Sequence, residues 1–290
     1  MNTLSNDQLT IQINPLGAEL SSIVTLDDNK EYLWQGGPGF WNGRSPVLFP
    51  IIGRLSNNEY RYKDKTYKME QHGFARRKPF ELIRNTAHQL IYKLTDDEKI
   101  RENYPFHFSL FIGYKLIGRE IEVSWKVQNN GNDDMYFQIG AHPGFYYSDL
   151  DPADNLRGYF AFNNHKDIKY KLLHPENGCL MDQEYPVEFQ NGLMPITTST
   201  FNKDALILEN SQIQKVSLID KHQKPYVSLL FNAPVLGLWS PGSESPFVCI
   251  EPWYGRCDKI DFTGELKERD WIQHLEAGSV FETRYFITIE

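Results

Sequence analysis

The sequence predicts an all-β protein built as a large antiparallel β-sandwich. In REIEVSWKVQ (Arg119–Gln128), apolar and polar residues alternate with the period of two that is typical of a half-buried strand. The apolar positions are Ile121, Val123, Trp125 and Val127. Short stretches rich in β-branched and aromatic residues recur along the chain between turn residues. Helix signals are sparse, which disfavours a parallel α/β sheet.

Two hairpins follow from the pattern. Phe106–Leu116 is expected to pair with Arg119–Gln128 across a short link at Gly118. YRYKDKTYKM is expected to form a second hairpin with Lys63-Asp64-Lys65 at its turn. The other expected strands are Leu9–Asn14, Glu19–Thr25, Phe80–Arg84, Gln89–Leu94, Met135–Ile139, Gly158–Phe162, Gln214–Asp220, Tyr226–Phe231, Val235–Trp239, Phe247–Glu251 and Ser279–Ile289.

One helix of two turns is expected in the segment that starts at Thr95. Thr95 would cap it, Glu98 follows three residues later, and Pro105 lies just beyond its end. No stretch rich in Pro, Gly and Ser divides the run of strands, so one domain over residues 1–290 is expected.

Composition excludes several kinds of partner. Thirty Lys and Arg residues against 38 Asp and Glu residues give a net charge of −8, which argues against nucleic acids and against a polybasic membrane surface. Cys179, Cys249 and Cys257 form no CxxC pair, which disfavours a disulfide scaffold. The start of the chain lacks a signal-peptide pattern, and no apolar run is long enough to span a membrane. We therefore expect a cytoplasmic protein, as a monomer or homodimer.

Three polar clusters lie at turns, where side chains are held rigidly and still reach solvent. The apolar run of LFPIIGRL ends at Arg54, whose guanidinium can donate paired hydrogen bonds to hydroxyls or to a carboxylate. QHGFAR places His72 before a glycine, and GAHPGFYY places His142 in a Pro-Gly turn with Phe145–Tyr147 as an expected aromatic floor. The alternatives are a surface salt bridge for Arg54 and structural roles for both histidines.

A fourth cluster, PFVCIEPWYG, places Glu251 at the end of a buried strand. Burial raises the pKa of a carboxyl group, so Glu251 is a candidate general base; an exposed glutamate at a strand end is the alternative. Asp204 in FNKDALIL and Trp239 in LGLWSPG lie in further turn or strand-end segments. Together these groups are typical of a carbohydrate site, because sugar faces stack on rings while hydroxyls take hydrogen bonds.

Other kinds of site lack their motifs. The sequence contains no HExxH, no Cys/His zinc spacing, no GxSxG elbow, no GxGxxG after a strand and no P-loop lysine. No metal is therefore expected.

In this order, the polar segments resemble the aldose 1-epimerase (galactose mutarotase) family, and the whole chain is similar to its LacX-like bacterial branch. The resemblance extends from QINPLGAELSSI through LFPIIGRL, QHGFAR, GAHPGF, DALIL and CIEPWYG to LEAGSVFETRYFITI, and GAHPGF and EPW are its most specific parts. It implies a β-sandwich of the galactose mutarotase type. It also implies a cofactor-free enzyme that interconverts the α and β anomers of an aldohexopyranose.

The resemblance also implies a role for each matching residue. Glu251 would be the general base at the C1 hydroxyl, and His142 the general acid at the ring oxygen. His72 and Arg54 would hydrogen-bond the sugar around the reacting atoms, and Asp204 would fix a hydroxyl.

Two departures from better-known mutarotases leave alternatives open. GAHPGF replaces a longer Asn-Thr-containing segment, and HGFAR also resembles the hexose-6-phosphate 1-epimerase branch. Arg76 would then bind a phosphate, although strand alternation would turn Arg77 away, and Glu70 and Glu81 are expected to neutralise the cluster, which favours a neutral hexose. A non-catalytic sugar-binding protein, and a glycoside hydrolase that uses Glu251 with Asp204, are the remaining alternatives.

Overall fold

The computed structural model describes residues 1–290 and confirms the predicted antiparallel β-sandwich. Strands hold 49 % of the residues and helices 4 %. One sheet has nine strands, a second has eight, and three smaller sheets complete the fold. No helix is long and apolar enough to cross a membrane.

The nine-stranded sheet contains the predicted hairpin. Pairing runs from Glu120 opposite Ile117 to Asn129 opposite Phe108, and the four alternating apolar side chains of the second strand are all buried. In spatial order the strands are β17 (Met194–Thr197), β14 (Leu156–Phe162), β19 (Lys215–Ile219), β20 (Pro225–Phe231), β24 (Val280–Ile289), β10 (Glu120–Asn129), β9 (Phe108–Ile117), β8 (Gln89–Thr95) and β7 (Glu81–Asn85).

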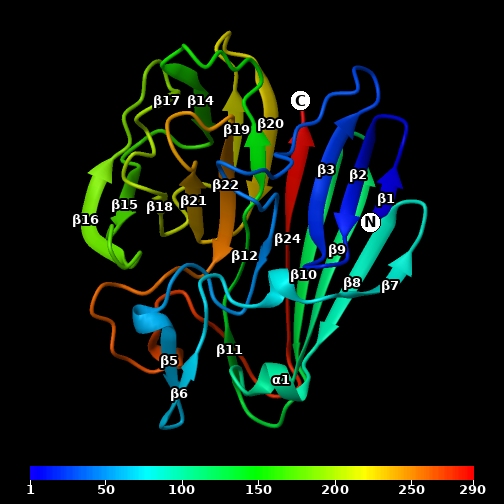
Figure 1. Cartoon of the computed structure of the whole chain (residues 1–290), viewed down its shortest axis with the longest axis vertical. Helices are drawn as coiled ribbons and strands as arrows, with labels where there is room; N and C mark the ends of the chain where they lie inside the picture. Colours follow the sequence, from blue (N-terminus) through cyan, green and yellow to red (C-terminus); the bar gives the residue numbers. More distant parts are fainter.

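The eight-stranded sheet lies beside it in Figure 1. Its strands are β16 (Leu180–Pro186), β15 (Lys169–Leu173), β18 (Leu206–Leu208), β21 (Val235–Trp239), β22 (Phe247–Tyr254), β12 (Ile139–Ala141) and β4 (Val47–Leu48), with β13 (Gly144–Tyr146) also paired to β22. Since β22 has neighbours on both sides, residues on it are held rigidly.

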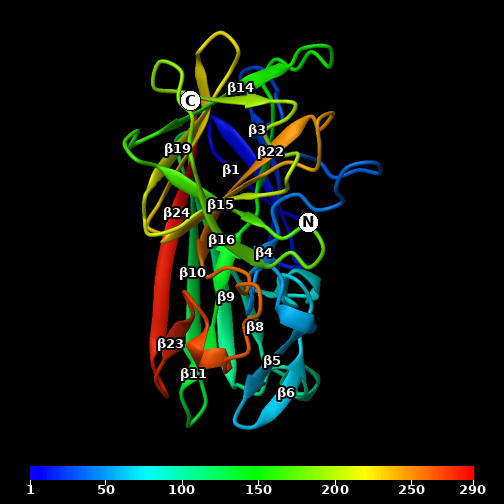
Figure 2. The same ribbon diagram turned by 90° about the vertical axis from the view of Figure 1, so that its left-hand side faces the viewer.

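The three smaller sheets complete the molecule. They are β1 (Asn2–Ser5), β2 (Leu9–Asn14) and β3 (Glu19–Thr25); β11 (Met135–Phe137) with β23 (Gln273–Leu275); and β5 (Glu59–Tyr62) with β6 (Lys65–Lys68). The first sheet packs over β8 and β9, where the Tyr92 hydroxyl donates to the Asn2 side chain at 2.9 Å. The two two-stranded sheets lie at the lower end of the molecule (Figures 1 and 2).

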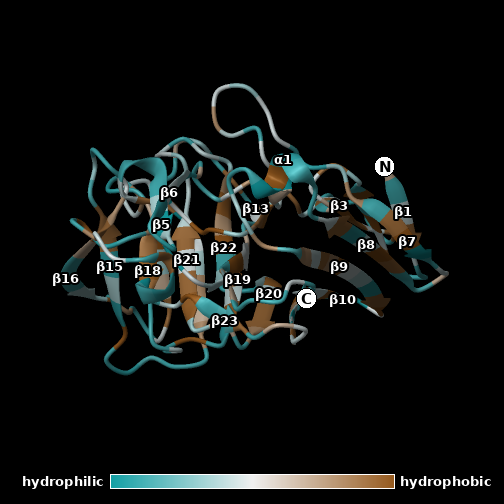
Figure 3. Cartoon of the chain, turned by 90° about the horizontal axis from the view of Figure 1, so that it is seen from below, coloured by the Kyte–Doolittle hydropathy of each residue, from teal (hydrophilic) through white to brown (hydrophobic).

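A single cluster of 66 buried residues fills the space between the sheets. Figure 3 shows the hydrophobic colour concentrated on the strands and the hydrophilic colour on many of the connecting loops. The cluster takes side chains from the large sheets and from the smaller ones. One domain over residues 1–290 stays a prediction, and the continuity of this cluster supports it.

Local chemistry explains where the observed elements differ from the expected ones. The turn of the β5–β6 hairpin contains only Lys63 and Asp64, both with positive φ, so Lys65 already belongs to β6. The helix, α1 (Glu98–Arg101), has one turn, and its cap is Asp97 rather than Thr95, because Asp97 accepts from the Ile100 amide. The strand expected over Met135–Ile139 is split between β11 and β12.

The pattern missed β1, β4, β13, β15, β16, β17, β18 and β23. Most of these strands are two to five residues long, which is too short for a period of two to be distinguished from a loop. Each of them is defined by its pairing with a neighbouring strand rather than by its own sequence pattern.

Candidate active site

A cavity of about 400 Å³ opens on the face of the eight-stranded sheet that points away from the main core. Every candidate site residue from the sequence lines it: Arg54, His72, Arg76, His142, Asp204, Trp239 and Glu251. The structure thus brings together segments that are distant in the chain. The roles of these residues stay predictions.

Side-chain alternation on β22 places Glu251 in this cavity. Val248 and Ile250 belong to the main core, so Glu251 and Trp253 lie on the opposite face. The expectation that Glu251 ends the strand is wrong, because β22 continues beyond it and pairs Glu251 with Gly237 of β21. Its carboxyl group is therefore fixed by a central strand.

Two glycines make room for the indole of Trp253 in the cavity wall. A Cβ at Gly140 would come within 2.6 Å of the ring, and a Cβ at Gly237 within 2.7 Å. The indole Nε1 donates to the carbonyl of Ala141 at 3.2 Å. The ring is thus held across three neighbouring strands, β12, β22 and β21, and supports the floor beneath Glu251.

Burial sets the protonation of Glu251 and His142. Glu251 is 1 % exposed, and desolvation, followed by the charge of Asp204, raises the pKa of its carboxyl well above the usual range. His142 is 8 % exposed, and desolvation lowers the pKa of its imidazole to about 3. The imidazole is therefore neutral near pH 7, and the shift of Glu251 favours its protonated carboxyl.

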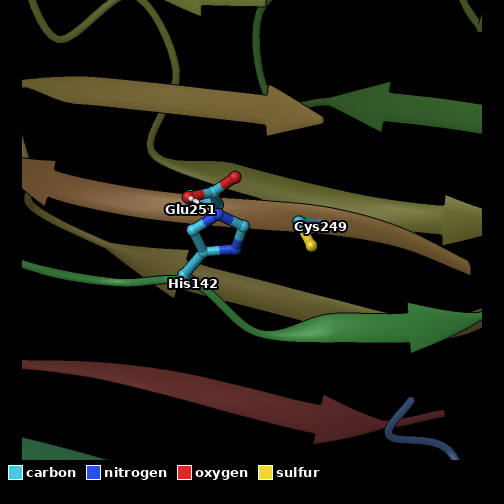
Figure 4. Close-up of side chains that lie close together, drawn as sticks. All are labelled: His142, Cys249 and Glu251. Carbon is cyan, nitrogen blue, oxygen red and sulfur yellow. Dashed lines mark ion pairs between the residues drawn. The ribbon is translucent and has the colours of Figure 1, made fainter. Parts of the chain in front are cut away.

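The two groups face each other across the cavity floor. The Nε2 atom of His142 lies 3.3 Å from Oε2 of Glu251, as the dashed line in Figure 4 marks. Neither this carboxyl oxygen nor the His142 Nδ1 has a hydrogen-bond partner. The arrangement leaves an acid and a base free to exchange protons with a ligand.

Tryptophan rings, rather than Phe145–Tyr147, surround His142. Trp41 stacks on the imidazole with ring centres 4.7 Å apart. Trp239 packs edge-on against the same imidazole, with ring centres 5.5 Å apart. The expected aromatic floor is wrong: Phe145 is buried in the main core, and none of the three residues lines the cavity. Phe145 and Tyr147 face the main core, Tyr146 packs against a separate cluster of Trp34, Phe247 and Cys249, and a distant loop supplies Trp41.

The backbone around Gly53 fixes the orientation of His72. The His72 amide donates to the Gly53 carbonyl at 3.0 Å, and the Gly53 amide donates to the His72 Nδ1 at 3.1 Å. Because Nδ1 is an acceptor, the proton of the neutral ring is on Nε2. Gly73 is required next, since its φ is +68° and a Cβ would come within 2.2 Å of the Phe49 carbonyl oxygen.

Arg54 and Arg76 contribute two uncompensated positive charges. Nε of Arg54 lies 3.4 Å from the side-chain oxygen of Gln71, and Nη2 of Arg76 donates to the Gln71 carbonyl at 2.9 Å. Neither arginine forms a salt bridge. Burial lowers the pKa of Arg76. A ligand with an anionic group would find both guanidinium groups available.

The expected strand placement of this cluster is wrong, because Arg76 and Arg77 lie in a 3₁₀ turn, η2 (Ala75–Arg77). The expected neutralisation holds in part. Glu70 pairs with Arg77 outside the cavity, Glu81 pairs with neither arginine, and Arg76 has no salt bridge. A short turn separates neighbouring side chains by roughly 120°, which explains why Arg76 enters the cavity while Arg77 leaves it.

Asp204 and the turn between β15 and β16 form the outer rim. Asp204 has a φ of +70°, is exposed, and its carboxylate accepts from the Ala205 amide at 2.8 Å. Sequence reasoning missed four other lining residues: Trp41, Gln71, His174 and Glu176. Gln71 could have been found beside His72, but the others lie in loops without a periodic signal.

The only group of side chains suited to a metal ion is His142, Cys249 and Glu251. Their ligand atoms lie within 4.8 Å of one another, and Figure 4 shows Cys249 on the same strand as Glu251. A zinc ion would lie at about 2.0–2.3 Å from each ligand atom, and it would take the Cys249 sulfur as a thiolate. Burial also raises the pKa of the Cys249 thiol, which opposes the thiolate form that zinc prefers.

The fold and the cavity define a β-sandwich protein with a polar small-molecule site walled by tryptophan rings. Residues 1–269 match the family model of the aldose 1-epimerases, and the chain belongs to the aldose 1-epimerase family. The chromosomal protein LacX of Lactococcus lactis subsp. lactis is 30 % identical, over 99 % of this chain and 98 % of its own.

Solved structures of similar proteins agree with this family. A galactose mutarotase related enzyme from Lactobacillus acidophilus superposes with a TM-score of 0.92 at 32 % identity, covering 100 % of this chain and 97 % of its own. A galactose mutarotase-like protein from Lactobacillus casei ATCC 334 has a TM-score of 0.93 at 27 % identity and covers both chains fully, 100 % of each. The likeness confirms the galactose mutarotase fold.

Proposed function

We propose that the protein is an aldose 1-epimerase that interconverts the α and β anomers of an aldohexopyranose. The observation that carries the proposal is the 3.3 Å contact between His142 Nε2 and Glu251 Oε2 inside a cavity of about 400 Å³. Anomer interconversion needs an acid and a base at two neighbouring oxygen atoms, and this pair is spaced for that task. Family membership supports the same reaction.

In the proposed reaction the Glu251 carboxylate takes the proton of the C1 hydroxyl while the His142 imidazolium protonates the ring oxygen. The bond between C1 and the ring oxygen breaks, and the electron pair of the hydroxyl forms the aldehyde. Rotation about C1–C2 presents the other face, and the ring closes with both proton transfers reversed. Atoms and charges balance without a cofactor.

The pair needs one proton in total, and burial supplies this state. In the empty cavity burial disfavours both charges, which favours the proton on Glu251 and a neutral His142. Sugar hydroxyls that donate hydrogen bonds to the carboxylate favour its ionised form. Ligand binding thus shifts the same proton onto His142, where ring opening requires it.

The surrounding groups would hold the sugar. The protonated Nε2 of His72 and the Arg54 guanidinium are donors for oxygen atoms near the reacting bond, and Asp204 is an acceptor for a hydroxyl at the rim. Trp41 and Trp239 offer flat surfaces for the apolar face of the ring. The same enclosure excludes water and strengthens each polar contact.

A specific observation favours a second substrate, a hexose 6-phosphate. Arg54 and Arg76 are both in the cavity without a carboxylate partner, and a phosphate would accept charge-assisted hydrogen bonds from them. The expected neutralisation by Glu70 no longer argues against this ligand. Kinetics on a neutral hexose and on its 6-phosphate would show which sugar is preferred.

Polarimetry tests the proposal. Freshly dissolved α-glucose and α-galactose should reach equilibrium faster with the protein than in buffer, and α-glucose 6-phosphate is measured in parallel by a coupled assay. Binding of sugar without acceleration would indicate a non-catalytic binding protein. Release of a reducing sugar from a glycoside, without anomer interconversion, would indicate a hydrolase that uses Glu251 with Asp204.

We also place the protein in the cytoplasm. All three cysteines are buried and unpaired, which fits a reducing compartment.

A further inference from the structure

A buried ion pair lies directly behind the cavity wall that carries Arg54. Oδ1 of Asp258 is 3.1 Å from Nη1 of Arg269, and their side chains are 3 % and 2 % exposed. Neither residue lines the cavity, and the proposed reaction does not use them. Burying both charges carries a large desolvation cost, which suggests that the pair has a role in holding the cavity wall.

Asp258 binds two parts of the cavity wall at once. Its amide donates to the Arg54 carbonyl at 3.0 Å, and its Oδ2 accepts from the Ser56 amide at 2.8 Å. Its own carbonyl accepts from the Leu180 amide at 2.7 Å. Leu180 follows the turn that carries His174, so one residue connects the two sides of the cavity opening.

The backbone beside Asp258 also packs tightly against the segment before Arg54. A Cβ at Gly53 would lie 2.6 Å from Cβ of Cys257, and Gly53 has a φ of +68° that favours glycine. The Cys257 carbonyl is in turn held by Nη1 of Arg256 at 2.8 Å. The backbone of Gly53–Ser56 is therefore fixed from behind by Cys257 and Asp258.

The Arg54 side chain has little else to hold it. It is exposed, forms no salt bridge, and its one side-chain hydrogen bond, to Gln71, is 3.4 Å long. We propose that Asp258, oriented by Arg269, is a positioning residue that sets the location of Arg54 over the bound sugar. This inference rests on the proposed function of the cavity.

Two variants separate positioning from folding. Asp258→Ala removes the acceptor for the Ser56 amide but leaves Arg269 unpaired, whereas Asp258→Asn keeps an oxygen that can accept from that amide. Ser56→Pro removes only the donor and leaves both buried charges paired. Leu55 has a ψ of 150°, which is the conformation that a residue before proline favours, so this variant should fold.

Asp96 provides a matched control. Like Asp258 it is a buried carboxylate that pairs with an arginine, Arg101, and accepts from a backbone amide, that of Phe108 at 2.7 Å. It lies near α1 and does not line the cavity. Asp96→Ala should therefore lower thermal stability as Asp258→Ala does while leaving kcat/KM within about twofold of wild type.

The test is a double-mutant cycle on kcat/KM, measured well below the melting temperature of every variant. We expect Ser56→Pro and Asp258→Ala to lower kcat/KM by about 10- to 100-fold, because small misplacements of a binding group cost this much. Asp258→Asn should recover most of the loss. In an Arg54→Lys background, the same changes should lower kcat/KM less than twofold further. Equal factors in both backgrounds, or no loss in wild type, would overturn the proposal.

Hydrogen exchange separates this inference from the proposed function. If wild-type protein has no mutarotase activity, the proposed function fails, and amide exchange of residues 53–58 still reports on positioning. Faster exchange there in Asp258→Ala but not in Asp96→Ala supports the role of Asp258. Unchanged exchange in that segment refutes it.

Discussion

Burial moves the pKa values of His142 and Glu251 in opposite directions, although their nearest side-chain atoms are only 3.3 Å apart. Each shift favours the neutral form of its group. The proposed reaction uses the ionised pair, so sugar binding has to overcome the preference of both groups for the neutral form.

Glu251→Gln and His142→Asn should each lower kcat by roughly 10²–10⁴-fold, as expected for the loss of one positioned acid or base. The amides keep the shape of the cavity, so sugar affinity should change much less. Polarimetric kinetics with a binding isotherm measure both. Glu176→Gln is the control, since this carboxylate lies at the rim outside the pair. If Glu251→Gln kept more than about half of wild-type turnover, the base would be another residue.

The pair should give stability a plateau between about pH 4.5 and 6.5. Below pH 4.5 the unfolded chain binds protons on Glu251 and on His142, whereas the folded chain keeps only the one on Glu251. Above pH 6.5 the unfolded chain has released both protons, whereas the raised pKa of Glu251 makes the folded chain hold its proton more strongly. The contribution of the pair to the free energy of unfolding therefore falls on both sides of the plateau, by up to about 1.4 kcal/mol per pH unit.

Urea unfolding of wild type, Glu251→Gln and His142→Asn over a pH series measures the contribution of each group to the free energy of unfolding. Relative to Glu251→Gln, wild-type protein should lose stability as the pH rises above 4.5. Relative to His142→Asn, it should lose stability as the pH falls from 6.5 towards 3. A constant difference between wild type and either variant over these ranges would show that the group titrates alike in both states.

EDTA should leave activity unchanged, because the proposed acid and base need no metal and burial raises the pKa of the Cys249 thiol, which opposes the thiolate that zinc prefers. Cys249→Ala should likewise keep kcat within about twofold. Activity assays after dialysis against a chelator measure both. Activity that disappears in EDTA and returns with zinc would mean that these three residues hold a required metal.

Arg76→Ala should lower kcat/KM for glucose 6-phosphate at least tenfold more than for glucose. A hydrogen bond to a charged group contributes about 1.5–3 kcal/mol, and only the phosphate would accept one from Arg76 at full strength. Lys78→Ala is the control: this lysine follows the same turn but does not line the cavity, so its loss should affect both sugars equally. An equal loss on both sugars for Arg76→Ala would show that Arg76 binds no anion.

Gly237→Ala should destabilise the protein by about 1–3 kcal/mol, since its Cβ would overlap the Trp253 ring at 2.7 Å. The displaced ring should also raise KM for the sugar, because Trp253 supports the cavity floor beneath Glu251. Gly37→Ala is the control, as its nearest atom would be at an ordinary 3.6 Å. Urea unfolding and sugar kinetics are measured for both variants. Equal stability and equal KM in Gly237→Ala and Gly37→Ala would contradict the proposed role of Trp253.

The sequence by itself determined the class of fold and the candidate residues of the site. The alternation in Arg119–Gln128 requires one buried and one solvated face, so β10 and its hairpin with β9 followed directly. Six separate segments named seven residues that all line one cavity. Such local patterns are readable because a strand's side chains alternate whatever surrounds it.

Only the tertiary structure decided which face of β22 is covered and by what. Period two places Glu251 opposite Ile250, but it does not show that Trp41 stacks on His142 or that Asp258 holds the Arg54 backbone. The sequence also did not show that Glu70 pairs with Arg77, which leaves Arg76 without a salt bridge. These relationships join segments far apart in the chain, and their energies arise from burial and contact that exist only after the sheets have packed.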